Sequence, residues 1–169
     1  MAERKKVFFR NKVLLVTFAS GLLVGLVLSG LVLMAMMPSM MIITKESTLG
    51  FNETVAALEK SITDHGWVVA DVKDMNKALS KQGVEFAPRV KLIKFCNAEY
   101  ASDVLATDRY ISTMRPCTCS VWEYDDGKIY LSKMNMSLMG KLFGGNIARV
   151  MGGSVAKEEA DVLSGILKD

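Results

Sequence analysis

The sequence predicts a two-layer α+β domain, with a mixed sheet and helices on one face, preceded by one transmembrane helix. Three observations predict this class. An uncharged apolar run occupies residues 13–37, short β-rich and amphipathic segments alternate after it, and a strong hairpin signal lies at residues 118–134. The expected parts are therefore a basic cytoplasmic tail at 1–12, a membrane helix at 13–37 and a folded domain at 38–169.

The apolar run is long enough to cross a bilayer. At a helical rise of ~1.5 Å per residue it reaches about 37 Å, against a hydrocarbon core of ~30 Å. A cleavable signal peptide would instead have an apolar stretch of ~7–15 residues followed by a small-residue cleavage site. Here Leu, Val and Met continue up to Pro38, so we expect an uncleaved anchor.

Charge around the run predicts its orientation. Five basic residues precede it against the single acidic Glu3, a net charge of +4, while Lys45 and Glu46 cancel after it. The positive-inside rule places the N-terminus in the cytoplasm and the domain outside it, in the periplasm if the organism is a bacterium. The tail accounts for all of the chain's +3, so nucleic-acid binding is not expected.

Small residues recur every four positions in the predicted anchor, at Thr17, Gly21, Gly25 and Ser29. They would share one helix face and include a Gly-x-x-x-Gly, which lets two helix backbones approach closely. This pattern predicts packing with a second copy or with another membrane protein. The alternative is that glycine is simply frequent in membrane helices.

The domain begins without a Ser/Gly linker. Residues 40–45 include the β-branched residues Ile42, Ile43 and Thr44 and predict a strand. The next segment predicts a helix with Asn52 as N-cap, an apolar stripe and Gly66 just past its end. The elements expected after it are a strand at 67–72, a helix at 74–81 stopped by Gly83, a strand at 89–95 and a helix at 98–106.

The clearest local signal is a hairpin. Two β-rich runs flank Asp125-Asp126-Gly127, and Asp-Gly is a strong two-residue turn. Two helices are expected to close the chain, at 137–151 with an interruption at Gly144-Gly145, and at 154–167. The glycines in this region are interpreted as points of close packing, because no phosphate-loop signature accompanies them.

Several short motifs together resemble one family. They are Phe51-Asn-Glu-Thr-Val-Ala-Ala-Leu, Gly66-Trp, Lys94-Phe-Cys-Asn, Met114-Arg-Pro-Cys, Asp126-Gly-Lys and Met134-Asn. Over residues 39–151 the chain resembles the domain of unknown function 302 family. The resemblance implies a small α+β domain similar to the TATA-binding-protein class of curved sheet, often dimeric, and it implies no enzyme activity.

The three cysteines are the best candidates for chemistry. Cys117 and Cys119 lie at i and i+2 of a predicted strand, where Cα atoms are ~6.5 Å apart or more, so they are poorly placed to bond each other. Cys96 with one of them is the candidate disulfide. The alternatives are a reactive redox pair with the third cysteine as resolver, and buried thiols that act as small apolar residues.

Soft sulfur donors make copper an alternative, with weak candidate ligands at His65, Met134, Met136 and Met139. Methionine also fills irregular cores, and a histidine at a helix C-terminus is favoured by the helix dipole. The chain has no Cys-x-x-Cys-His, which excludes covalently attached haem. No cofactor is predicted; copper or haem binding stays an alternative.

An apolar segment follows the hairpin and includes Leu138, Phe143 and Met151. It could be core, a dimer contact or the lining of a ligand pocket. No catalytic residue is predicted, since the paired aspartates of the hairpin are turn residues first. The sequence therefore predicts a membrane-anchored binding or accessory domain that associates as a homodimer or with other membrane subunits. Thiol redox chemistry through Cys96 and Cys117 is the alternative.

Overall fold

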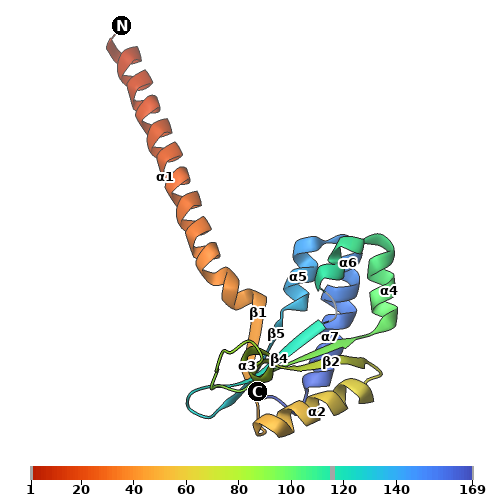
Figure 1. The fold of residues 1–169 in the computed structure, drawn as a ribbon. Helices are drawn as coiled ribbons and strands as arrows, with labels where there is room; N and C mark the ends of the chain where they lie inside the picture. The colour runs from red at the N-terminus through yellow and green to blue at the C-terminus, as the bar shows by residue number, and fades with distance from the viewer. Residues whose placement is uncertain (1, 115–116, 169) are drawn as a thin grey trace. The chain divides into compact units, whose positions relative to one another are not determined.

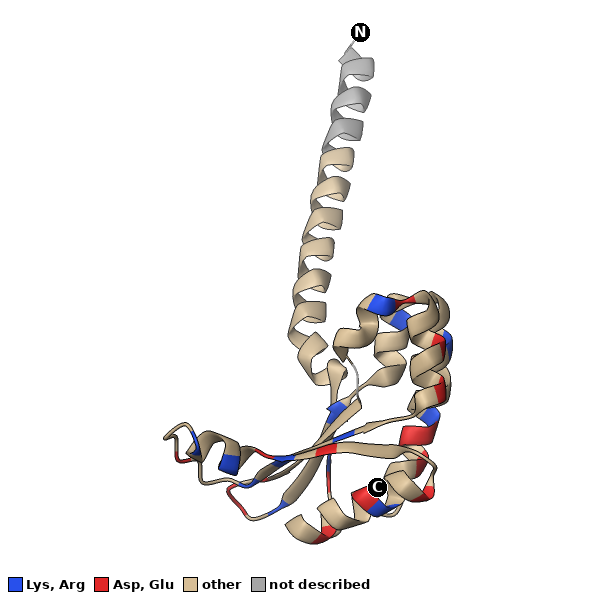
Figure 2. Ribbon diagram, turned by 45° about the vertical axis from the view of Figure 1, so that its right-hand side comes forward, with Lys and Arg blue, Asp and Glu red and all other residues tan. Residues whose placement is uncertain are grey.

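The structure, a computed structural model, describes residues 2–114 and 117–168. It divides into two compact units, Met1–Ser39 and Met40–Asp169. Helix α1 (Ala2–Met41) makes up the first (Figure 1). From Leu14 to Met41 this helix has a mean hydropathy of 2.3, and its 28 residues are long enough to span a membrane. Figure 2 shows no charged residue along this stretch.

The apolar helix ends four residues later than predicted. Pro38 lies inside its last turn, where the Ser39 hydroxyl donates to the Met36 carbonyl over 2.8 Å. A proline lacks its own N–H and crowds the carbonyl four residues before it, yet residues 39–41 continue the helix after Pro38. The first strand consequently begins at Ile42 and not at Met40.

The domain is built on a five-stranded sheet in the order β1-β5-β4-β3-β2. The strands are β1 (Ile42–Glu46), β2 (Val68–Asp74), β3 (Val90–Cys96), β4 (Cys117–Glu123) and β5 (Ile129–Met134). Every neighbouring pair is antiparallel, so the predicted mixed sheet is wrong. From β2 to β5 each strand pairs with the next strand along the chain, whereas β1 and β2 lie at opposite edges of the sheet and are joined through α2 (Phe51–Asp64).

Helices α2 (Phe51–Asp64) and α7 (Ala156–Leu163) cover one face of this sheet (Figure 1). They lie against each other, and the Ser61 hydroxyl donates to the Val162 carbonyl over 2.7 Å. Alternate residues of β4 point to the helices, and Cys117, Cys119 and Val121 are all buried. The core is thus a single layer between sheet and helices, as the α+β prediction required.

Local capping signals decide where the shorter helices begin. Helix α3 (Met75–Ser80) starts where the Asp74 carboxylate accepts the Lys77 N–H over 3.0 Å. Asn97 caps α4 (Ala98–Thr107) in the same way, and a 3-10 helix, η1 (Arg109–Met114), follows. The predicted cap of α2 was wrong by two residues. The N-cap is Gly50, whose N–H donates to the Glu53 carboxylate over 3.1 Å.

The C-terminal helices are more continuous than expected. Helix α5 (Met136–Phe143) ends at Gly144, but α6 (Gly145–Arg149) runs through a π-helical turn, η2 (Val150–Val155), directly into α7. The predicted break near residue 152 is therefore absent. Close packing is confirmed, since a Cβ atom on Gly140 would lie 2.5 Å from the Gly152 Cα atom.

Candidate functional site

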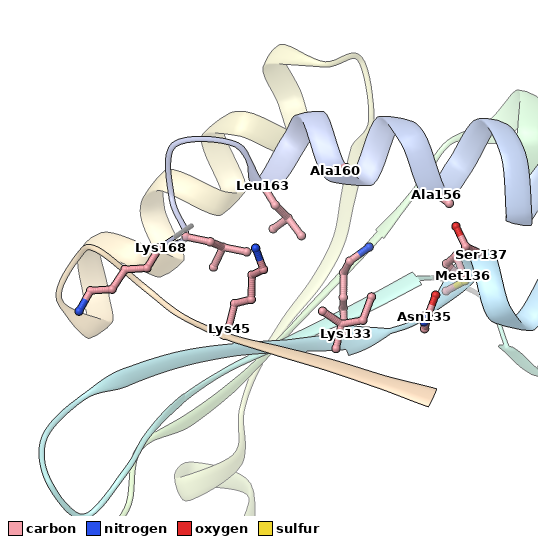
Figure 3. Close-up of a pocket in the computed structure, with 11 residues that line it drawn as sticks. Lys45, Lys133, Asn135, Met136, Ser137, Ala156, Ala160, Leu163 and Lys168 are labelled. Atoms are coloured by element: carbon pink, nitrogen blue, oxygen red, sulfur yellow. The ribbon is translucent and has the colours of Figure 1, made fainter. Parts of the chain in front are cut away.

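A cavity of about 300 Å³ opens between the sheet and α7 (Figure 3). Ile43, Lys45 and Lys133 line it from β1 and β5, and α7 contributes Ala156 and Ala160. The start of α5 and the C-terminal segment close its two ends. Cavities of about 300–1,000 Å³ are typical of small-molecule sites, so this one is large enough for a small ligand.

Strand register explains why lysines line this cavity. Ile43 pairs with Lys133, and Lys45 pairs with Leu131, whose side chain is buried in the core. Residues paired across strands share a face, so all of these side chains point to the helix layer. On α7, Ala156 and Ala160 are one turn apart and face the cavity with short side chains. Their small size leaves the space open.

Behind the cavity lies a buried ion pair. The Lys133 Nζ atom is 2.7 Å from the Glu159 carboxylate, and the two side chains are 11% and 2% exposed. The Cys117 thiol also hydrogen-bonds to this carboxylate. Burial raises the pKa of Glu159, and Lys133 and Cys117 offset part of that rise. A charged group in this position depends on its partners for stability.

The cysteines are thiols in this structure. Burial raises the pKa of Cys119 well above its ordinary value, and the nearby Glu159 charge adds to the rise. Phe95 is the register partner of Cys117, so Cys96, one residue further, points to the opposite face. The register therefore disagrees with the predicted bridge from Cys96 to Cys117 or Cys119. Because its pKa is raised, the buried Cys119 thiol is also a poor nucleophile.

A second carboxylate on α7 joins three elements. Glu158 accepts a hydrogen bond from Trp67 Nε1 over 2.8 Å and another from the Tyr100 hydroxyl. The Trp67 ring lies 5.5 Å from that of Phe95, centroid to centroid. This network fixes α7 over the sheet and so positions the neighbouring Glu159.

Sequence reasoning missed Lys133 and Glu159. Glu159 falls on the apolar stripe of α7, between Val155 and Val162, which are both buried. An acidic residue on such a stripe is a signal for a buried ion pair, because charged residues are almost never fully buried unless paired. Its partner could not be found in this way, since Lys133 lies in a strand 26 residues earlier.

The three predicted ligand-contact residues lie apart from this cavity. Met151 is in the core at 1% exposure, and Leu138 is half-buried. Phe143 is 42% exposed, and its ring lies 6.4 Å from that of Tyr110. None of them is among the described residues that line the cavity. The structure therefore assigns Met151 to packing.

The candidate metal ligands are dispersed. His65 is exposed at the end of α2, with Nδ1 2.8 Å from the Ser61 carbonyl oxygen. Met136 and Met139 are buried in α5, and Met134 packs against the core from β5. Among the residues that the structure describes, no cluster of three or more His, Cys, Asp or Glu side chains could hold a metal ion. Copper or haem binding stays a prediction.

The small-residue face lies along the exposed surface of α1. Thr17, Gly21, Gly25 and Ser29 are all exposed, and a Cβ atom on either glycine would meet nothing within 4 Å. The Ser29 hydroxyl donates to the Leu26 carbonyl over 3.0 Å. The face is therefore sterically open to another helix.

Comparison with known proteins identifies the family of the domain and a solved structure of similar fold. The family described as "Domain of unknown function DUF302" matches residues 43–168. The chain belongs to the DUF302 family. A solved structure, that of an uncharacterized conserved DUF302 protein from Bacillus stearothermophilus, has a TM-score of 0.65 and 21% sequence identity. The aligned region covers 73% of this chain and 96% of the solved chain. No curated protein matches the chain.

The DUF302 domain includes the cavity and the buried ion pair, because the matched residues run from the first cavity residue, Ile43, to the last, Lys168. At 21% identity the solved structure supports the fold alone. The α1 helix precedes the matched region.

Proposed function

We propose that this DUF302 protein is a single-pass membrane protein whose α+β domain lies outside the cytoplasm and acts as a binding or accessory domain. The supporting observation is that the uncharged part of α1, the 28 residues from Leu14 to Met41, ends directly before the first strand at Ile42. With no linker between them, the helix would hold the domain at the membrane surface. The basic tail supports an N-terminus in the cytoplasm.

Topology is the direct test. The full chain is expressed in a bacterium with a C-terminal reporter enzyme that folds only outside the cytoplasm, and the membranes are washed at high pH. We expect reporter activity and a protein that resists the wash. A variant without residues 14–39 is the matched control, and it should leave the membrane fraction. If this reporter is inactive, and a reporter that works only in the cytoplasm is fully active at the same C-terminal position, the proposed orientation is refuted.

The partners of the anchor form a second part of the proposal. The open face that contains Gly21 and Gly25 would pack against a second copy or another membrane subunit. Native mass spectrometry of protein extracted in mild detergent reports the assembly. Gly21→Leu with Gly25→Leu should dissociate it, whereas Leu23→Phe on the opposite side should not. An assembly that survives the double substitution contradicts this part.

Two other expectations stay predictions. The TATA-binding-protein class of curved sheet is implied by family resemblance only. Thiol redox chemistry through Cys96 and Cys117 is less well supported, because these residues point to opposite faces and Cys117 is buried. The binding proposal is better supported because the domain has a cavity with polar and apolar walls.

A further inference from the structure

The cavity between β1, β5 and α7 has a cationic wall and an apolar wall. Figure 3 shows the side chains of Lys45 and Lys133 extending from the sheet with their amino groups toward α7. Lys168 also borders the cavity, but its amino group points away and forms an ion pair with Glu46. Two ammonium groups thus point into the space from one side.

Lys45 contributes a positive charge to this cavity that no ion pair among the described residues offsets, whereas Lys133 and Lys168 are each paired with a carboxylate. No Asp or Glu is among the described residues that line the cavity. Lys45 is exposed, and none of the ion pairs among the described residues includes it. Lys133 binds Glu159 over 2.7 Å behind the cavity. An ammonium group has three N–H donors, so Lys133 can keep Glu159 and still donate to an acceptor in the cavity.

The opposite wall is apolar. Ala156, Ala160 and Leu163 follow one another along α7, and Met136 and Leu167 close the two ends. Short side chains at two successive turns leave a channel rather than a filled core. A volume of about 300 Å³ is at the lower end of ligand cavities. It would hold a single medium-length hydrocarbon chain and is too small for a two-chain lipid.

We propose that this cavity binds a single-chain anionic amphiphile, with its acidic headgroup at Lys45 and Lys133 and its hydrocarbon chain along Ala156, Ala160 and Leu163. This assignment rests on the proposed function, since a domain held at a membrane has such molecules at hand. Lys45 follows Met41 by four residues, which at ~3.3 Å per strand residue puts it within about 13 Å of the end of the apolar helix. The headgroup is a carboxylate or a phosphate monoester.

Native mass spectrometry of the full chain in a neutral detergent tests the assignment with four defined probes. Decanoate and decyl phosphate have both a charge and a chain, decanol has the chain alone, and inorganic phosphate has the charge alone. We expect one saturable adduct with decanoate or decyl phosphate. The tighter of the two identifies the headgroup. Decanol bound as well as decanoate, or inorganic phosphate bound while neither amphiphile binds, would overturn the proposal.

Variants locate the adduct. Ala160→Leu fills the channel and should abolish binding; Ala160 is exposed, so the core stays intact. Lys45→Gln removes one charge-assisted hydrogen bond and should weaken binding about tenfold. Lys60→Gln, on exposed α2 surface, is the control and should bind as the unaltered protein does. Unchanged binding by Ala160→Leu and Lys45→Gln refutes the site. Membrane retention is measured separately, so a failed ligand leaves the anchor result standing.

Discussion

Replacing Lys133 with methionine is expected to destabilise the domain by about 3 kcal/mol at pH 7. Removing one partner of a buried ion pair costs about 3–5 kcal/mol, because the other charge stays buried without compensation. Glu159 is 2% exposed, and among the residues that the structure describes the Cys117 thiol is the side-chain hydrogen-bond partner it would keep. We take the lower end of the range because Lys133 lines an open cavity through which water can reach the carboxylate.

The double variant Lys133→Met with Glu159→Leu separates charge from packing. Apolar residues of similar volume often replace a buried pair at no cost, so it should be within ~1 kcal/mol of the unaltered protein. Lys60→Met, which removes an exposed ion pair to Asp64, should change stability by no more than about 0.5 kcal/mol. Urea unfolding of the detergent-solubilised chain, followed by tryptophan fluorescence, measures all three. If Lys133→Met is no less stable than Lys60→Met, the reasoning is refuted.

The remaining predictions concern pH, packing and thiol accessibility. Burial raises the pKa of Glu159 above its unfolded value, and losing Lys133 raises it further, so the folded variant takes up a proton as pH falls. The stability gap between the unaltered protein and Lys133→Met should therefore narrow from pH 7 to 5, by at most about 1.4 kcal/mol per pH unit; a widening gap in urea unfolding contradicts this. Gly140→Ala should lower the unfolding midpoint, at a cost of about 1–3 kcal/mol, because its Cβ atom meets backbone at 2.5 Å, whereas at Gly153 the nearest atom is 3.9 Å away. If Gly153→Ala and Gly140→Ala have the same unfolding midpoint, the close backbone contact between Gly140 and Gly152 is contradicted. In native protein an alkylating reagent should modify half-buried Cys96 before Cys119, which is 0% exposed; peptide mass spectrometry reports the order, and equal rates would contradict it.

Local features were determined by the sequence. The apolar helix follows from an uninterrupted run of residues that water solvates poorly. The hairpin forms around Asp125-Asp126-Gly127, where the Gly127 N–H donates to the Tyr124 carbonyl over 2.9 Å and Gly127 has a positive φ of 79°. Asp126 has no positive φ, so the loop is longer than the predicted two-residue turn. Helix α3 begins at Met75, one residue after the predicted start at Asp74, and the Asp74 carboxylate caps it. Each of these depends on neighbours within a few positions, which a sequence displays directly.

Pairing between distant segments was decided only by the tertiary structure. β1 joins β5, so Ile43 lies opposite Lys133, and α7 then brings Glu159 to the same lysine. The cavity exists because those strands and that helix meet with short side chains at Ala160. Cys117 pairs with Phe95, so Cys96, the next residue along β3, lies on the opposite face of the sheet. Composition and periodicity predict which face of an element is apolar, but they do not encode which element will cover it, since that depends on the free energy of packing the whole chain.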